Sequence, residues 1–159
     1  MGSERGRIAE ISVNRKGLRD FHILERLEAG VELKGTEVKS IRSGFANIQG
    51  AFARVEGGQL WLYGLDVREY EKASFAQHEP KRQRRLLVSR KEIDRLFGQT
   101  QLKGRALVGL RLYWKGHLVK VEIGVGEGKE KADQRADLKA RAVQRETQRE
   151  VSHFNRTRG

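Results

Sequence analysis

The spacing of the apolar residues changes once, at Gly35, and this change constrains the fold more than any other feature of the chain. Over residues 21–33 apolar side chains occupy nearly every second position, which is typical of a strand with one buried face. Beyond Gly35 they recur at steps of three and four, which predicts a short helix that ends at Gly44. The other face of this helix would carry Lys39 and Arg42. We therefore expect a strand that leads directly into a short helix to be the centre of the fold.

The first turn of this predicted helix carries polar residues suited to a helix start. Thr36 can cap the turn, and Glu37 suits its positive end. Carboxylates in a first helical turn or on a strand face usually serve capping, solubility or ion pairing. We therefore assign no catalytic role to Glu37, Glu28 or Asp20.

Two pairs of strand-like segments follow, and each pair is joined by a turn that contains glycine. Strands at short spacing with brief helices between them predict a mainly β fold with short helices. The expected architecture is a small antiparallel barrel of about six strands and two to three helices, closed or nearly closed. The paired segments are 51–55 with 60–67, joined through Gly57 and Gly58, and 107–113 with 119–125, joined through Lys115 and Gly116.

A further helix is predicted over residues 89–98, after a short apolar strand at 86–88. Ser89 and Glu92 match a capping box, and Gly98 would end the helix. Its inner stripe would consist of Ile93, Leu96 and Phe97.

Aromatic residues at alternate positions mark the second strand of the first pair. Trp61 and Tyr63 share one face of this strand with Leu65 and Val67. Such a row is either a platform on which bases stack or part of the core. We interpret it as core, because leucines rather than basic residues fill the neighbouring positions.

The charge of the chain points to a polyanionic partner. The formal net charge is +12 and the pI is about 10.4. Residues 14–128 hold 22 basic and 14 acidic residues, and residues 129–159 hold nine and five. RNA, DNA and an anionic membrane surface all remain possible on this evidence.

Composition also limits the chemistry that is possible. There is no cysteine, which excludes disulfides and thiolate metal sites. The four histidines are scattered singly, without metal-ligand spacing. We therefore expect a binding protein with no cofactor and no metal rather than an enzyme, with a structure-specific nuclease as the rival. The lack of cysteine also removes any argument for an oxidising compartment, so a cytoplasmic location is the default expectation. The chain has no apolar run of signal-peptide or membrane-spanning length, so we expect it to be soluble.

The chain divides into three predicted parts. Residues 1–13 would be a flexible N-terminal segment, in which Ile8, Ile11 and Val13 can add at most a short pairing segment. Residues 14–128 would form the barrel, and residues 129–159 a basic C-terminal tail that is disordered, or helical on binding. A surface helix with solvated charges is the alternative for this tail. The glycines at 124, 126 and 128 are interpreted as a hinge before it.

Two basic clusters lie within the predicted barrel. The segment 14–19 is a basic loop before the first strand, and it either contacts phosphate or is simply solvated. Residues 81–85 form the densest cationic cluster of the chain.

Several motifs of the chain resemble the SmpB family of tmRNA-binding proteins. The resemblance covers residues 14–135 in order and spacing. The motifs are NRKGLRDF, LEAGVELKGTEVKSIRSGFANI, RQRRLLVSRKEIDRL, LRLYWKGHLVKVEIGVGEGK and KADQR.

This resemblance implies a barrel of the oligonucleotide-binding type and a role in ribosome rescue. The family binds the tRNA-like domain of tmRNA, also called SsrA RNA, and brings it with elongation factor Tu to stalled ribosomes. The C-terminal tail then enters the vacant message channel near the decoding centre, and the nascent peptide is tagged. A ribosomal or tRNA-binding barrel protein without a rescue role is the alternative.

The resemblance also suggests which residues bind. Ser89 stands where the family commonly has Asn or His, and Ala132 where it usually has His or Tyr. The RNA-binding candidates are Lys16, Glu28, Leu87, Ser89 and Lys120, and the ribosome-contacting candidates in the tail are Lys129, Lys131, Asp133, Arg135, Arg141 and Arg145.

Overall fold

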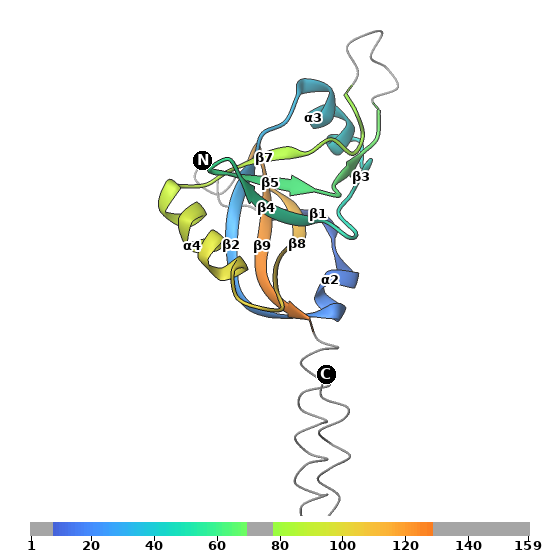
Figure 1. The fold of residues 1–159 in the computed structure, drawn as a ribbon. Helices are drawn as coiled ribbons and strands as arrows, with labels where there is room; N and C mark the ends of the chain where they lie inside the picture. The colour runs from blue at the N-terminus through green and yellow to red at the C-terminus, as the bar shows by residue number, and fades with distance from the viewer. Residues whose placement is uncertain (1–7, 70–77, 129–159) are drawn as a thin grey trace, which may run out of the picture.

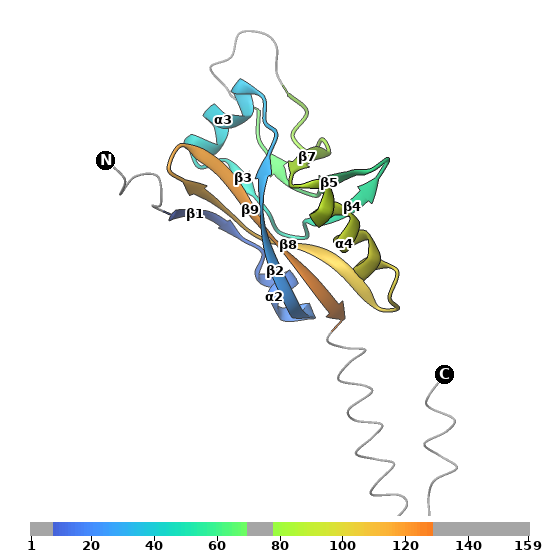
Figure 2. The same cartoon turned by 90° about the vertical axis from the view of Figure 1, so that its left-hand side faces the viewer.

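The computed structural model describes residues 8–69 and 78–128, which form nine strands and three helices (Figures 1 and 2). The helices are α2 (Arg15–Asp20), α3 (Gly35–Arg42) and α4 (Arg90–Thr100). The strands are β1 (Ile8–Val13), β2 (Phe21–Val31), β3 (Ala46–Asn47), β4 (Phe52–Glu56), β5 (Gln59–Tyr63), β6 (Asp66–Val67), β7 (Arg84–Leu87), β8 (Arg105–Lys115) and β9 (Leu118–Gly128).

Six antiparallel strands close into a barrel. The order β8-β4-β5-β7-β2-β9 returns to its start because β9 also pairs with β8. A closed ring leaves none of these strands as a free edge along its whole length. The predicted mainly β fold with short helices and a small antiparallel barrel is confirmed.

The inner face of the barrel follows from the alternation of side chains along each strand. Leu60 and Leu62 on β5 are fully buried, as are Val121 and Ile123 on β9. Each such side chain contributes roughly 1.5–3 kcal/mol of burial free energy. Because alternate residues point inward, the residues between them lie on the outer surface, where a ligand can reach them.

The glycines of β9 are part of the barrel wall rather than a hinge. Strand β9 runs to Gly128 and pairs with both β2 and β8. A Cβ on Gly124 would lie 2.7 Å from Cδ1 of Leu110, and one on Gly126 would lie 3.1 Å from Phe21. The hinge interpretation is therefore wrong for Gly124 and Gly126, where neighbouring side chains fill the space that a Cβ would need. Gly128 ends the strand, and a Cβ there would meet nothing within 4 Å.

The N-terminal part of the described chain also departs from expectation. Residues 8–13 form β1, which pairs with β8, so they are the short pairing segment that Ile8, Ile11 and Val13 allowed rather than a flexible lead. The expected basic loop at 14–19 is instead the N-cap and nearly all of α2. Asn14 is buried and caps this helix, accepting a hydrogen bond from the Gly17 amide (2.9 Å) and donating one to the Gly109 carbonyl (2.8 Å). This contact, 95 residues apart in sequence, replaces the expected loop with an anchored helix.

Helix α4 extends beyond its predicted end. It continues through Gly98 to Thr100, and Ser89 caps it by accepting a hydrogen bond from the Glu92 amide (3.3 Å). Ile93 and Leu96 are buried as predicted, but Phe97 is 49% exposed and is not part of the inner stripe. Gly98 did not end the helix, because a glycine within a helix destabilises it by only about 1 kcal/mol relative to alanine.

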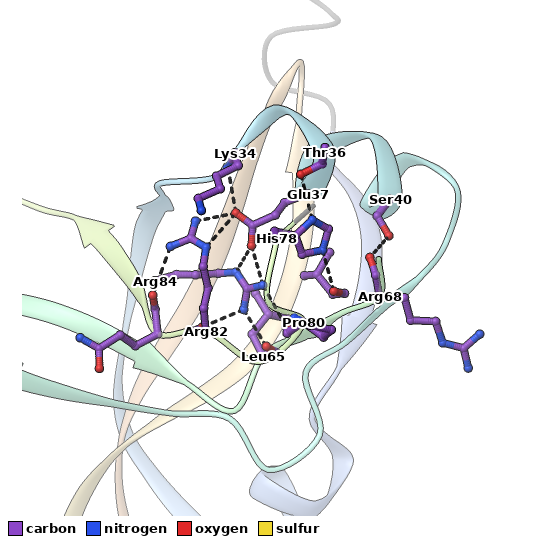
Figure 3. A network of polar contacts seen from close by, with 12 residues as sticks. Lys34, Thr36, Glu37, Ser40, Leu65, Arg68, His78, Pro80, Arg82 and Arg84 are labelled. Atoms are coloured by element: carbon purple, nitrogen blue, oxygen red, sulfur yellow. Dashed lines mark hydrogen bonds and ion pairs between the residues drawn. The ribbon is translucent and has the colours of Figure 1, made fainter. Parts of the chain in front are cut away.

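A buried ion-pair network attaches α3 to one end of the barrel (Figure 3). Glu37 on α3 and Arg84 on β7 are both completely buried. The Glu37 carboxylate accepts hydrogen bonds from Nε of Arg84 (2.6 Å), from Nη2 of Arg82 (2.5 Å) and from the Lys34 amide (2.8 Å). The N-cap position is occupied by Lys34 rather than Thr36, and no side chain caps it from that position. The Glu37 carboxylate accepts from the Lys34 amide there, and the Thr36 hydroxyl instead contacts Nδ1 of His78 (2.9 Å).

The remaining donors of Arg84 are also satisfied. Its Nη1 donates to the carbonyls of Leu65 (2.7 Å) and Arg82 (3.0 Å), and its Nη2 donates to the Pro80 carbonyl (3.0 Å). A buried charge is tolerated only when it is paired and hydrogen-bonded, and this network meets both conditions. Burial would raise the pKa of Glu37, but hydrogen bonds from Arg82, Lys34 and Arg84, with the charge of Arg84, more than offset this and lower it.

We predict that Glu37→Gln lowers the free energy of unfolding by about 3–5 kcal/mol, because it leaves Arg84 buried without a countercharge. Urea denaturation followed by circular dichroism measures this loss. The control is Asp94→Asn, which removes an exposed pair with Arg90 (3.9 Å) and should cost less than about 1 kcal/mol.

The same network predicts the acid sensitivity of the fold. The pKa of Glu37 is lower in the folded chain than in the unfolded chain. Its contribution to the free energy of unfolding is therefore complete at pH values above the pKa of an unfolded glutamate. That contribution is lost as the pH falls through the pKa that Glu37 has in the folded chain. Equal losses in the free energy of unfolding for Glu37→Gln and Asp94→Asn would show that the buried network does not stabilise the fold.

Candidate nucleic-acid interface

The outer surface where β7, β2 and β9 meet brings together two of the predicted RNA-binding residues. Gly30 pairs with Leu87 on one side and with Lys120 on the other. A Cβ on Gly30 would lie 3.3 Å from Cβ of Leu87 and 3.6 Å from Nζ of Lys120. The missing side chain therefore lets an exposed apolar group and a cation meet over the strand. Leu87 is 48% exposed, so it is not core.

Glu28 lies two residues before Gly30 on the same outer face of β2. Its carboxylate accepts hydrogen bonds from the Tyr113 hydroxyl (2.5 Å) and from Nζ of Lys115 (3.1 Å). The Tyr113 hydrogen bond lowers the pKa of Glu28 most, and burial raises it. Lys115 and the charge of Lys120 lower it further, so the net effect is a lowered pKa. Burial raises the pKa of Tyr113, and the hydrogen bond to Glu28 raises it further. An oriented, ionised carboxylate can accept hydrogen bonds from a guanine edge or a ribose 2′-hydroxyl.

Ser89 follows Leu87 by two residues at the start of α4. Its hydroxyl is exposed but already accepts the capping hydrogen bond from Glu92. The structure thus gives Ser89 a helix-capping role beside Leu87.

Lys16 lies apart from this cluster. It is an exposed residue of α2, which comes just before the first residue of β2, whereas Glu28 and Gly30 lie near the last. Its amide donates to Oε1 of Gln49 (3.5 Å). The structure therefore groups Glu28, Leu87, Lys120 and Ser89 but places Lys16 elsewhere.

Lys16 instead lines a groove of about 820 Å³ between α2, β4, the start of β8 and the end of α4. Phe52 and Arg54 of β4 line it, and Arg105 stands at the start of β8. Two acidic residues, Asp20 and Glu56, also line the groove. Sequence reasoning did not find this groove, because its walls come from four segments far apart along the chain.

The basic cluster at 81–85 is largely committed within the fold. Arg82 and Arg84 bind Glu37, and Arg85 pairs with Glu32 at 3.1 Å between Nε and Oε2. The density of charge in this segment is therefore mostly a structural feature rather than a phosphate-binding patch.

The aromatic row on β5 does not belong wholly to the core. Leu60 and Leu62 point inward and are fully buried, so Trp61 and Tyr63 between them lie on the outer face and are half-buried. Gly64, with φ of +82°, shifts the alternation, and Leu65 beyond it is buried. The core interpretation is therefore wrong for Trp61 and Tyr63 and correct for Leu65 and Val67.

The six tail candidates, Lys129, Lys131, Asp133, Arg135, Arg141 and Arg145, lie outside the described residues. Within residues 8–69 and 78–128, no group of three or more His, Asp or Glu side chains is placed to hold a metal ion. No helix in this part of the chain has the length and apolarity needed to cross a membrane.

Comparison with known proteins gives a consistent result. The family described as SmpB protein matches residues 11–153. An SsrA-binding protein of Carboxydothermus hydrogenoformans is 50% identical over 139 residues, which cover 87% of this chain and 93% of the relative. An SsrA-binding protein of Halalkalibacterium halodurans is 44% identical over 156 residues, which cover 98% and 100%.

A solved structure is also similar to this chain. It is described as "tmRNA-SmpB: a journey to the center of the bacterial ribosome". The similarity has a TM-score of 0.62 at 44% identity, over 77% of this chain and 84% of that one.

The geometry around Glu28 leads to a prediction about its titration. Tyr113→Phe removes the hydrogen bond that lowers the Glu28 pKa most, so the pKa of Glu28 should rise. A carboxyl NMR titration of the wild type and the variant measures this change. Tyr63→Phe, which removes a hydroxyl on another strand, should leave Glu28 unaffected. The same Glu28 pKa in all three proteins would show that Tyr113 does not orient the carboxylate.

Proposed function

The chain belongs to the SmpB protein family, and from this membership we propose that it binds tmRNA and acts in trans-translation. It binds the tRNA-like domain of tmRNA and delivers this RNA to stalled ribosomes for rescue and nascent-peptide tagging. The observation that carries this proposal is 50% identity to an SsrA-binding protein along 93% of that relative's length. Its partners are tmRNA and the ribosome, with elongation factor Tu engaged indirectly through alanyl-tmRNA.

The cluster around Gly30 is the proposed contact with tmRNA. Lys120 supplies a cation for a backbone phosphate, and the Glu28 carboxylate accepts hydrogen bonds from a base edge or a 2′-hydroxyl. Leu87 offers an exposed apolar surface against which a base or ribose can pack. Ser89 lies at the edge of this surface, and Lys16 would contact RNA from the far end of β2.

We assign the contact with the ribosome to the basic tail, residues 129–159. Lys129, Lys131, Asp133, Arg135, Arg141 and Arg145 are the proposed contacts. Their excess of positive charge suits a surface of ribosomal RNA. The body of the protein would thus hold tmRNA while the tail engages the message channel.

We further propose that the protein is a non-enzymatic adaptor of the cytoplasm. Membership in an RNA-binding family supports this assignment.

The proposed function predicts which RNA the protein holds in cells. Purification of the full chain followed by sequencing of bound RNA should recover tmRNA as the dominant species. A mixture of tRNA or ribosomal RNA fragments without enrichment of tmRNA would favour the alternative, a barrel protein without a rescue role.

Glu28→Ala tests the proposed RNA contact. We expect weaker binding to tmRNA by roughly 5- to 150-fold, the loss typical of a well-formed specific contact. The melting temperature should fall only modestly, because Glu28 lies on the outer surface with 36% of its side chain exposed and the main structural loss is the partner of the Tyr113 hydroxyl. Glu10→Ala, an exposed carboxylate on β1, is the matched control. A collapse in melting temperature that parallels the loss of binding would assign Glu28 a structural role.

Deletion of all residues after Gly128 tests the proposed division of labour. Affinity for tmRNA should be retained, while peptide tagging in a reconstituted translation reaction should be lost. A large loss of tmRNA affinity would show that the tail is also part of the RNA grip.

A further inference from the structure

An aromatic strip runs over the outer surface of β4 and β5. We define it as Phe52, Trp61 and Tyr63, with Arg54 beside them. Phe52 pairs with Tyr63 and Arg54 with Trp61 across the two strands. Their neighbours Ala53 and Leu62 point inward and are buried, so the strip faces outward.

The rings of the strip are held in fixed orientations. The Phe52 and Tyr63 rings are stacked, with centroids 5.2 Å apart and an angle of 11° between their planes. The Trp61 indole donates a hydrogen bond from Nε1 to the Glu56 carbonyl (3.3 Å). Phe52 is nevertheless 41% exposed. Flat rings that are oriented and open to solvent can stack against bases at a small cost in conformational entropy.

Cations accompany the rings. Cζ of Arg54 lies 5.9 Å from the Phe52 ring centroid, and Arg85 is paired across the strands with Trp61. Each arginine also has an acidic partner, Glu56 for Arg54 (3.9 Å) and Glu32 for Arg85 (3.1 Å). These pairs are partly exposed and therefore weak, so a phosphate can compete with the carboxylates for the guanidinium groups.

The strip lies between the two regions described above. On one side, Arg85 and Leu87 alternate on the outer face of β7, which connects the strip to the proposed tmRNA contact. On the other side, Phe52 and Arg54 form part of the groove of about 820 Å³ that Lys16 and Arg105 also line. The strip is thus continuous with a proposed RNA surface and ends in a groove with basic residues on its walls.

We propose that the aromatic strip is a second RNA contact, at which unpaired bases stack on Phe52, Trp61 and Tyr63. The backbone of the same segment would follow Arg54 and the basic residues of the groove. Alternating aromatic and cationic side chains on a barrel surface have the properties that single strands require, since every base offers a π face and every linkage a charge. This inference rests on the proposed function and adds a class of RNA element to it: a segment that is not base-paired.

The strip is tested with the full chain and a fluorescent, unstructured RNA of about eight nucleotides, a length that a small barrel can hold. Phe52→Leu and Trp61→Leu should each weaken binding by roughly 5- to 150-fold, the range for loss of one base stack. Leucine keeps apolar bulk on the half-exposed face, so the melting temperature should be retained. The control is Phe45→Leu, because Phe45 is 39% exposed and has Arg68 5.6 Å from its ring centroid, yet it lies outside the strip.

A second measurement reports stacking directly. In a Trp114→Phe background Trp61 is the only tryptophan, and its fluorescence should be quenched when the oligonucleotide binds. Unchanged affinity in both strip variants, or unchanged Trp61 emission at saturation, would overturn the proposal. Sedimentation that shows a wild-type dimer and monomeric variants, with RNA binding unaltered, would assign the strip to self-association instead.

The outcomes separate this inference from the proposed function. If Glu28→Ala weakens binding to tmRNA while the strip variants bind both RNAs normally, the strip proposal fails and the proposed function stands. If the wild-type protein shows no preference for tmRNA over an unrelated folded RNA, the proposed function itself fails.

Discussion

The contact between Glu37 and Arg84 is the interaction on which the arrangement of the molecule depends. Both side chains are completely buried, and they join the helix after β2 to the strand that closes the barrel between β5 and β2. Strand β7 has only four residues, so its place in the ring is supported by few backbone hydrogen bonds. The ion pair, with Arg82 and the carbonyls around Arg84, supplies specific contacts that a strand of this length cannot provide alone. Since Leu87 belongs to the same strand, the proposed tmRNA contact depends indirectly on this network.

The binding groups on the outer surface of the barrel are placed there by the alternation of side chains along each strand. Each strand that places a leucine inward places the next residue outward, and the outward residues from neighbouring strands meet according to their register. Lys120, Leu87 and Trp61 are such residues on β9, β7 and β5. A cation, an apolar surface and an aromatic ring thus follow one another around the barrel. None of these residues is part of the core, so the surface can carry binding groups without loss of packing.

Sequence reasoning predicted the features that are encoded locally. The strands and their turns were predictable because alternation and paired glycines act within a few residues, as at Gly57 and Gly58, which both have positive φ. The partners of Glu37 and Glu28 were not, because Arg84 and Tyr113 lie 47 and 85 residues away and carry no local sign of the pairing. The burial of Arg84 was likewise not predictable, because residues 81–85 are identified from the sequence only as the densest cationic cluster of the chain. Glu28 and Leu87 became candidates only through resemblance to a family, since composition alone gave no reason to select a carboxylate and a leucine as RNA contacts.

Strand β9 is hydrogen-bonded along both edges, to β2 and β8, and the pairing with β2 extends to Gly128, the last described residue. A pulling force applied to the chain beyond Gly128 along the strand axis would therefore load these two ladders in shear. Many hydrogen bonds would resist together, rather than opening one after another as in a peeled edge. The barrel thus resists mechanical tension at this point of the chain better than it would if β9 were a free edge strand.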